Sequence, residues 1–237
     1  MTERLFLEDA YCRQTSARVE RADAAGIVLD RTVFYARSGG QPGDCGVLRW
    51  TGGETRIAEA TKGEGETILH VPAEGAALPP IGAEVVGEID WAPRLALMRM
   101  HTAMHLMCAV LPGIAVTGGS VGGERSRLDF NLPEAPDKAA IEAALNALIE
   151  ADHPVSHEWV EESVLDSNPT LVRTLSVQPP RGTGRLRLVR IGGGEAPVDL
   201  QPCGGTHVAR TGEIGRVVVQ KIENKGKQNR RIVIVPG

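Results

Sequence analysis

Hydrophobic positions in the first 90 residues come in short runs that are separated by glycine, proline and polar residues. The runs are rich in valine, isoleucine and threonine, and no stretch keeps a helical period, which is typical of short strands joined by turns. They occupy residues 17–22, 26–35, 46–50, 55–61, 66–71 and 84–90. A proline-containing stretch at 73–82 is expected to be a loop before the last strand. We therefore predict a small N-terminal β-barrel or sandwich over residues 1–90.

The pattern changes at Trp91. Residues 91–111 read WAPRLALMRMHTAMHLMCAVL and are apolar on most sides, so they predict a buried helix. Pro93 suits its first turn, and Pro112 followed by glycine is expected to stop it.

Strands and helices mix after this helix without regular alternation. Residues 118–132 suggest a hairpin, and residues 137–152 predict an amphipathic helix with Ile141, Leu145 and Leu148 on one stripe. Further strands are expected at 153–162, 185–191, 215–223 and 231–236, with a short helix at 163–168 and a turn at 203–207. The fold class is therefore α+β, with the barrel followed by an α+β domain over residues 91–237.

Composition is that of a globular protein, with 42% hydrophobic and 24% charged residues in 237. No run approaches the roughly 18 apolar residues of a membrane span, and acidic residues such as Glu3 and Glu8 leave no apolar segment of the secretory kind at the start. We expect a cytoplasmic protein. The four cysteines are scattered, so Cys12 and Cys45 are expected to be plain thiols and any metal site would find free thiols.

Charge is uneven along the chain. Residues 1–90 carry 9 basic and 15 acidic side chains, whereas residues 181–231 carry 11 basic and 4 acidic ones. The densest stretch is KIENKGKQNRR at 221–231, which is either a solvated face or a contact for a polyanion. Aromatic residues make up only 3% of the chain, so contact with a nucleic-acid backbone suits it better than stacking on bases.

Two pairs of metal-ligand residues stand about a hundred positions apart. His101 and His105 are spaced i, i+4 in the predicted helix, so they face one side of it. Cys203 and His207 flank two glycines in CGGTH, which predicts a turn that points both inward. Imidazole nitrogen and thiolate sulfur are zinc ligands, and four of them are enough for one Zn²⁺.

Alternatives exist for these residues. Either histidine alone would be interpreted as a core residue whose ring nitrogens are hydrogen-bonded. Cys108 is interpreted as a small buried hydrophobic residue, although it stands on the same helix face as His105. A zinc peptidase would place glutamate after the first histidine as general base, and Thr102 stands there instead, so peptidase chemistry is disfavoured.

Five stretches together resemble one family. They are MRMHTAMHLM, GGSVGGERSRLDF, LQPCGGTHVARTGEIG, KIENKGKQNRRI and, in the N-terminal part, FYARSGGQPGD. In these stretches the chain resembles the editing domain of alanyl-tRNA synthetase and its stand-alone relatives, the AlaX alanyl-tRNA editing proteins of medium length. The resemblance implies hydrolysis of tRNA(Ala) mischarged with serine, or with glycine, and no ATP-dependent charging.

The resemblance also implies roles for individual residues. His101, His105, Cys203 and His207 match the positions that surround the family's zinc. Thr117 falls where the family places a side chain that senses the serine hydroxyl, although the synthetases often have glutamine there. Ser120, Arg125 and Arg127 are weaker candidates for the pocket or for tRNA contact. Gly39 and Gly40, otherwise an ordinary tight turn, match a loop that approaches the editing site.

An editing site is chemically reasonable because an apolar pocket cannot strongly reject serine, which differs from alanine by one hydroxyl. Zinc could polarise the ester carbonyl, activate water or hold the substrate amino group. Four protein ligands usually make a closed structural site, so substrate either expands the coordination or meets an ion that only organises the pocket. Two other functions compete: a zinc-stabilised tRNA-binding module without catalysis, and a zinc hydrolase of a small ester or amide.

Overall fold

The computed structural model describes residues 1–175, 182 and 184–237. Two compact units divide the chain, unit 1 over Met1–Leu95 and unit 2 over Ala96–Gly237. The helix α1 (Trp91–Val110) begins in unit 1 and continues into unit 2. Within the described residues, no helix is both long and apolar enough to cross a membrane.

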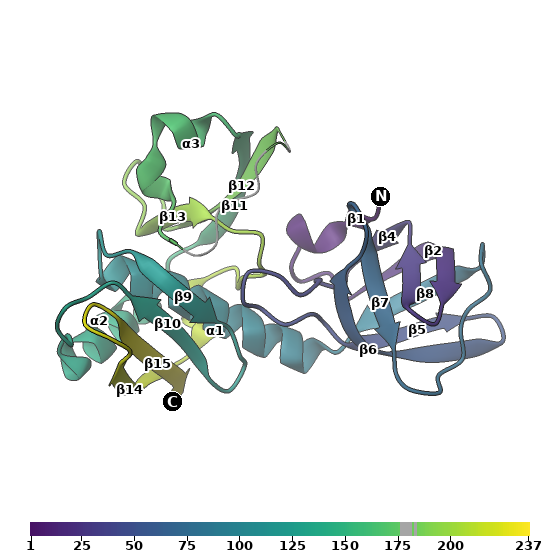
Figure 1. The fold of residues 1–237 in the computed structure, drawn as a ribbon, viewed down its shortest axis with the longest axis horizontal. Helices are drawn as coiled ribbons and strands as arrows, with labels where there is room; N and C mark the ends of the chain where they lie inside the picture. Colours follow the sequence, from purple (N-terminus) through teal and green to yellow (C-terminus); the bar gives the residue numbers. More distant parts are fainter. Residues whose placement is uncertain (176–181, 183) are drawn as a thin grey trace. The chain divides into compact units, whose positions relative to one another are not determined.

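Unit 1, whose residues are all described, is a closed antiparallel β-barrel, as the N-terminal pattern predicts (Figure 1). Its strands pair in the order β2-β3-β7-β6-β5-β8, and β8 returns to pair with β2. The strands are β2 (Gln14–Asp23), β3 (Gly26–Leu29), β5 (Gly46–Trp50), β6 (Gly53–Lys62), β7 (Ile68–Pro72) and β8 (Glu84–Ile89). A short parallel pair, β1 (Glu3–Arg4) with β4 (Arg31–Thr32), and a 3-10 turn at Leu5–Leu7 lie beside it.

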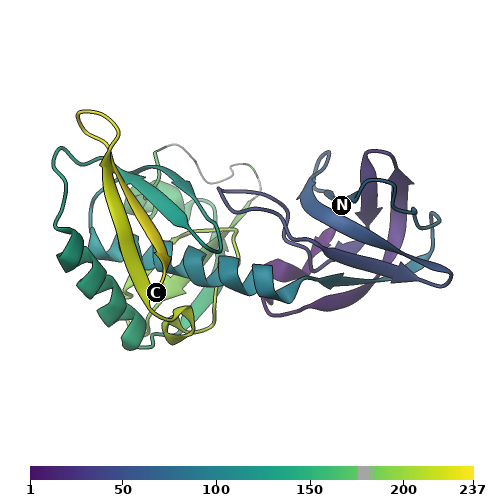
Figure 2. The ribbon, with the colours of Figure 1, turned by 90° about the horizontal axis from the view of Figure 1, so that it is seen from below.

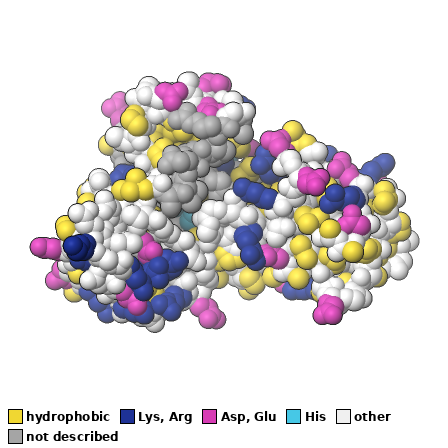
Figure 3. Space-filling model, in the orientation of Figure 1, with side chains coloured by type: hydrophobic (Ala, Val, Ile, Leu, Met, Phe, Trp, Pro, Cys, Tyr) yellow, Lys and Arg dark blue, Asp and Glu magenta, His cyan; other side chains and the backbone are white. Residues whose placement is uncertain are grey.

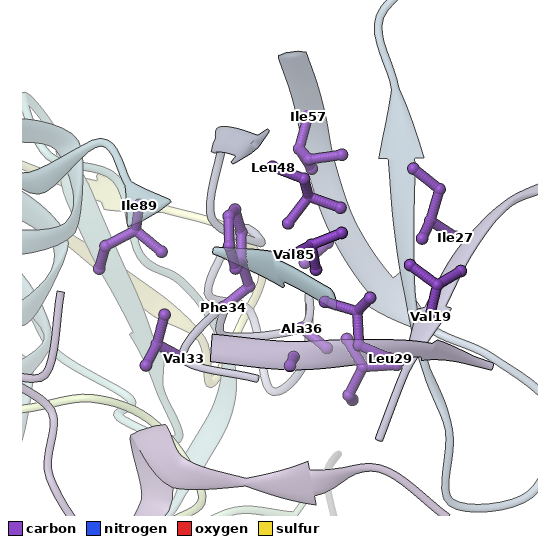
Figure 4. Close-up of a cluster of buried hydrophobic side chains, with 13 residues drawn as sticks. Val19, Ile27, Leu29, Val33, Phe34, Ala36, Leu48, Ile57, Val85 and Ile89 are labelled. Carbon is purple, nitrogen blue, oxygen red and sulfur yellow. The ribbon is translucent and has the colours of Figure 1, made fainter. Parts of the chain in front are cut away.

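The barrel interior is filled with apolar side chains from alternate strand positions (Figure 4). Phe34 and Val33 belong to this core, yet they follow β4 instead of continuing a strand. The β-type run expected over 26–35 is therefore divided into β3 and β4, and residues 33–35 continue as irregular chain. Side chains satisfy the buried main chain there: Phe34 N donates to Thr32 Oγ1, and Tyr35 N donates to Asp44 Oδ2.

In its described residues, unit 2 contains two antiparallel sheets besides α1 (Figure 1). The first has the order β14-β15-β10-β9, and the second has the order β11-β12-β13. The strands are β9 (Val116–Ser120), β10 (Ser126–Phe130), β11 (Val155–Glu161), β12 (Arg185–Ile191), β13 (Asp199–Pro202), β14 (Val217–Asn224) and β15 (Arg230–Pro236). Short helical turns occur at α3 (Val164–Ser167), η2 (Pro169–Leu171) and η3 (Thr211–Ile214). The predicted α+β class is confirmed.

The helix α2 (Lys138–Glu150) lies along β14 of the first sheet (Figure 2). Its N-terminus is capped by Asp137, whose side chain accepts from Ala140 N at 2.8 Å. The buried stripe is Ile141, Leu145 and Ile149, whereas Leu148 is only half-buried. The predicted stripe was therefore wrong in its last member, because the spacing i, i+4, i+8 is the one that faces the sheet.

Candidate metal centre

Helix α1 brings the first pair of ligands together. All residues from Met100 to Cys108 are buried, and His101 and His105 follow one another on one helix face with ring centroids 5.4 Å apart. The helix ends at Val110, before Pro112, as the sequence predicts. An apolar helix that buries two imidazoles needs partners for their nitrogens, because an unpaired buried polar group costs free energy.

The CGGTH segment supplies those partners. Residues 203–207 follow β13 as irregular chain, which confirms the prediction that this segment is not helical. Arg187 on β12 holds this segment, since its Nη1 donates to the carbonyl oxygens of Cys203 at 2.9 Å and Gly205 at 3.2 Å. Gly205 N in turn donates to Cys203 Sγ at 3.3 Å.

The four predicted ligands meet in one group. One ligand atom from each of His101, His105, Cys203 and His207 lies within 4.8 Å of all the others. Cys203 Sγ lies 3.3 Å from His207 Nε2 and 3.7 Å from His101 Nε2. Tetrahedral zinc with ordinary Zn–N and Zn–S bonds would place such pairs about 3.5 Å apart. The donor set and its spacing therefore fit a tetrahedral metal ion.

Electrostatics prepare the thiol to act as a ligand. Burial opposes ionisation of Cys203, but its interactions with the neighbouring rings of His101, His207 and His105 outweigh burial and hold the thiol pKa well below its ordinary value. Burial and repulsion from His101 lower the pKa of His207 to about 3, so this ring is a neutral ligand. At His105 burial also opposes the charged form, but hydrogen bonds to Asp199 and Cys203 outweigh it and raise the pKa to about 10.

Three residues outside the predicted site contact the ligand rings. Asp199 Oδ2 lies 2.9 Å from His105 Nδ1, and Gln201 Nε2 lies 3.1 Å from the same nitrogen. Thr102 Oγ1 lies 3.2 Å from His207 Nδ1. The period-two spacing of Asp199, Gln201 and Cys203 is a signal that would have found two of them, because alternate residues of a strand share a face.

Cys108 does not belong to this group of ligands. Burial and the negative charge of Asp199 raise its pKa to about 12, so it stays a thiol. The other cysteines, Cys12 and Cys45, are free and lie in unit 1.

The remaining predicted site residues lie outside the metal group. Thr117 is half-buried on β9, and its Oγ1 lies 3.1 Å from Asp129 O and 3.0 Å from Asn229 Oδ1. Ser120 ends the same strand and pairs with Arg127 on β10. Arg127 Nη1 donates to Asp129 Oδ2 at 2.9 Å, whereas Arg125 is exposed.

Gly39 and Gly40 form the exposed tip of a two-residue turn in unit 1. Their φ values are 56° and 84°, and Ser38 and Gln41 exchange main-chain hydrogen bonds across them. Glycine is favoured at both positions because the left-handed region strains other residues. The base of the loop is fixed by Asp44, which is buried and bound by the buried guanidinium of Arg94.

The basic stretch 221–231 is divided in its roles. Figure 3 shows lysine and arginine gathered over the part of unit 2 that carries β10, β14 and β15. Lys221 and Lys225 pair with Glu223 at 2.8 and 3.6 Å, and Arg231 pairs with Asp129 at 2.8 Å. Arg230 is only 9% exposed and donates to the carbonyl oxygens of Gly226, Asn229 and Pro133. Arg230 therefore shapes the β14–β15 turn, whereas both interpretations of the 221–231 stretch, a solvated face and a polyanion contact, expect its charges to be exposed.

Comparison with known proteins places these features in a family. A family model described as "Threonyl and Alanyl tRNA synthetase second additional domain" matches residues 186–233, and one described as "tRNA synthetases class II (A)" matches residues 7–93. The alanyl-tRNA editing protein AlaX-M of Methanosarcina acetivorans is 38% identical over 98% of both chains, and that of Saccharolobus solfataricus is 34% identical over 98% of both. The alanine–tRNA ligase of Pyrobaculum aerophilum is 40% identical over 94% of this chain, which spans 25% of that enzyme.

Proposed function

The chain belongs to the AlaX-M family of alanyl-tRNA editing proteins, and we propose that it is an aminoacyl-tRNA hydrolase that removes serine, and also glycine, from mischarged tRNA(Ala). The observation that carries the proposal is the convergence of His101, His105, Cys203 and His207 in unit 2. We propose that this group holds one Zn²⁺. The ion would act as a Lewis acid toward the ester that joins the amino acid to the terminal ribose.

The chain's own residues provide the rest of the site. Arg187 holds the CGGTH segment so that Cys203 and His207 face α1, and the Gly205 amide donates to the thiolate. Thr117 Oγ1 can accept a hydrogen bond from the serine hydroxyl, because a hydroxyl that donates to Asp129 O keeps lone pairs for acceptance. Alanine has no group for this bond, which would disfavour its productive binding.

The turn at Gly39 and Gly40 offers exposed backbone without side chains, which suits close approach to a substrate. Exposed Lys227 and the partly paired Lys221 and Lys225 would contact tRNA phosphates, while Arg230 serves the fold. These residues would contact the tRNA part of the substrate.

Deacylation of aminoacylated tRNA tests the proposal directly. Seryl-tRNA(Ala), glycyl-tRNA(Ala) and alanyl-tRNA(Ala) are each incubated with the zinc-loaded protein, and release of the labelled amino acid is followed. Faster release of serine than of alanine is expected. Binding of tRNA without turnover would identify a non-catalytic module, and equal turnover of a small amino-acid ester without tRNA would identify a general hydrolase.

A further inference from the structure

A buried carboxylate stands behind one of the ligand histidines. Asp199 is only 2% exposed, and its Oδ2 lies 2.9 Å from His105 Nδ1. In the described part of the chain this is its only ion-pair partner, and its other oxygen, Oδ1, is buried without a hydrogen-bond partner. A buried carboxylate without a compensating cation is costly, so the positive charge that it balances must come through His105.

The hydrogen bonds around Asp199 fix the position of one proton. Oδ2 of an ionised carboxylate can only accept, and it is approached by His105 Nδ1 and by Gln201 Nε2 at 2.8 Å. Both neighbours must therefore donate to it. When His105 serves as a metal ligand, its ring is a neutral imidazole with one proton. That proton then resides on Nδ1, and the lone pair of Nε2 is left for the ion.

Strand geometry explains why the carboxylate and a ligand come from one segment. Asp199 and Gln201 lie two residues apart on β13, and Cys203 follows at the same interval. Alternate residues of a strand point to one face, so one short segment delivers a carboxylate, an amide and a thiolate to the same side. Pairing of β13 with β12 sets this segment in place.

Charge provides a second, independent argument. A buried site that holds a divalent cation is neutral only if two negative charges accompany it. The thiolate of Cys203 supplies one, and the three histidine ligands supply none. Asp199 supplies the second, one imidazole away.

We propose that Asp199 is a positioning residue of the metal centre, which keeps the proton of His105 on Nδ1, leaves Nε2 for the ion and neutralises a divalent charge in this buried group. The inference rests on the metal centre in the proposed function. Carboxylates that orient ligand histidines in this way contribute about 10–100-fold to metal affinity in other proteins.

The test compares zinc affinity of the full chain with Asp199→Asn, measured by competition with a chromophoric chelator. Asparagine keeps the size and one acceptor oxygen but removes the charge. Glu195→Gln is the matched control, because Glu195 is exposed, lies four residues away and loses the same charge. We expect zinc binding about 10–100-fold weaker for Asp199→Asn and unchanged for Glu195→Gln. Equal affinity of all three proteins would overturn the role of Asp199.

A second measurement uses the unaltered protein and so does not depend on the folding of a variant. Nitrogen-15 NMR of the zinc-loaded chain assigns which nitrogen of His105 carries a proton. We expect a protonated Nδ1 and a metal-bound Nε2, and the reverse assignment would overturn the proposal. If the wild-type chain binds no zinc at all, the proposed metal centre itself is wrong. That result differs from normal zinc binding that is unaffected by Asp199→Asn, which would contradict only the role of Asp199.

Discussion

The two units of this protein both bury histidine, but they satisfy the ring nitrogens in different ways. In the barrel, His70 is fully buried, with Nε2 2.8 Å from Thr32 Oγ1 and Nδ1 3.0 Å from Ile27 O. In unit 2, His101 and His207 turn Nε2 toward Cys203 Sγ. Burial alone therefore does not identify a metal ligand. The distinction is whether the protein supplies ordinary hydrogen-bond partners for both nitrogens or directs several nitrogens to one point.

The chemical groups around the buried histidine rings also differ between the two units. Burial lowers the pKa of His70 to about 4, and the hydrogen bond to Ile27 O offsets this effect only in part. Its ring also packs edge-on against Phe34, with centroids 5.1 Å apart, as part of an apolar core. The rings of unit 2 instead have a thiol and, behind His105, a carboxylate as neighbours. Anionic neighbours of this kind suit a bound cation. The hydroxyl and carbonyl partners of His70 in the barrel suit a neutral core residue.

Removing the Cys203 thiol should have the largest effect, because it takes away the anionic ligand that distinguishes the histidines of unit 2 from His70. Cys203→Ser should weaken zinc binding by more than about 100-fold, beyond the range for groups that only orient a ligand, and should abolish deacylation. Zinc content and seryl-tRNA(Ala) deacylation measure both effects. Cys108→Ser is the matched control, because Cys108 is the buried cysteine outside the ligand group. Undiminished zinc in Cys203→Ser would remove the thiolate from the ligand set.

Acid should act on the barrel through His70. Its pKa in the folded protein lies below the ordinary 6.5, so the neutral ring contributes stability above pH 6.5 that is lost as the pH falls towards 4. A difference of this size corresponds to about 3 kcal/mol in the free energy of unfolding. Denaturant unfolding of wild type and His70→Gln between pH 7 and pH 4 isolates the effect. The variant should lose less stability across this range, and parallel curves would show that His70 does not titrate on unfolding.

Thr117 should affect selectivity without affecting the metal. Thr117→Val removes the hydroxyl, and an unpaired serine hydroxyl costs about 1–3 kcal/mol, so the preference for serine over alanine should fall by about ten- to a hundredfold. The valine variant also cannot hydrogen-bond to Asp129 O and Asn229. Asn229→Ala is therefore the control, since it removes one of the two hydrogen-bond partners of Thr117 while keeping the hydroxyl. If the Thr117→Val variant retains its zinc and its full preference for serine over alanine, another residue must discriminate between the two amino acids.

The basic residues of the β14–β15 hairpin should have the smallest effect. Replacing Lys221, Lys225 and Lys227 with glutamine should weaken tRNA binding and reduce the slope of log Kd against log salt by roughly 0.7–0.9 for each phosphate that is no longer neutralised. Lys138→Gln, on α2, is the control for a change of surface charge. An unchanged slope would show that the lysines belong to a solvated face.

Local patterns were sufficient for much of the fold. Period-two runs predicted most strands of the barrel, and the apolar stretch from Trp91 predicted α1 and its end before Pro112. The spacing of His101 and His105 placed both on one helix face because the helical repeat fixes that geometry. The motifs also carried the family resemblance, which the comparisons confirm.

Long-range pairing decided the rest. The strand β13 has only four residues and ends at Pro202, so its period-two spacing is too short to predict it securely, and pairing with β12 holds it in place. The same pairing brings Asp199 to His105 across 94 positions of sequence. In the sequence Arg230 is one charge among several in a basic stretch. In the folded chain its guanidinium donates to the carbonyl oxygen of Gly226 in the β14–β15 turn. Sequence determines the repeat of a helix or strand because that repeat depends on neighbours along the chain, whereas the partners of a buried charge depend on segments that only the folded chain brings together.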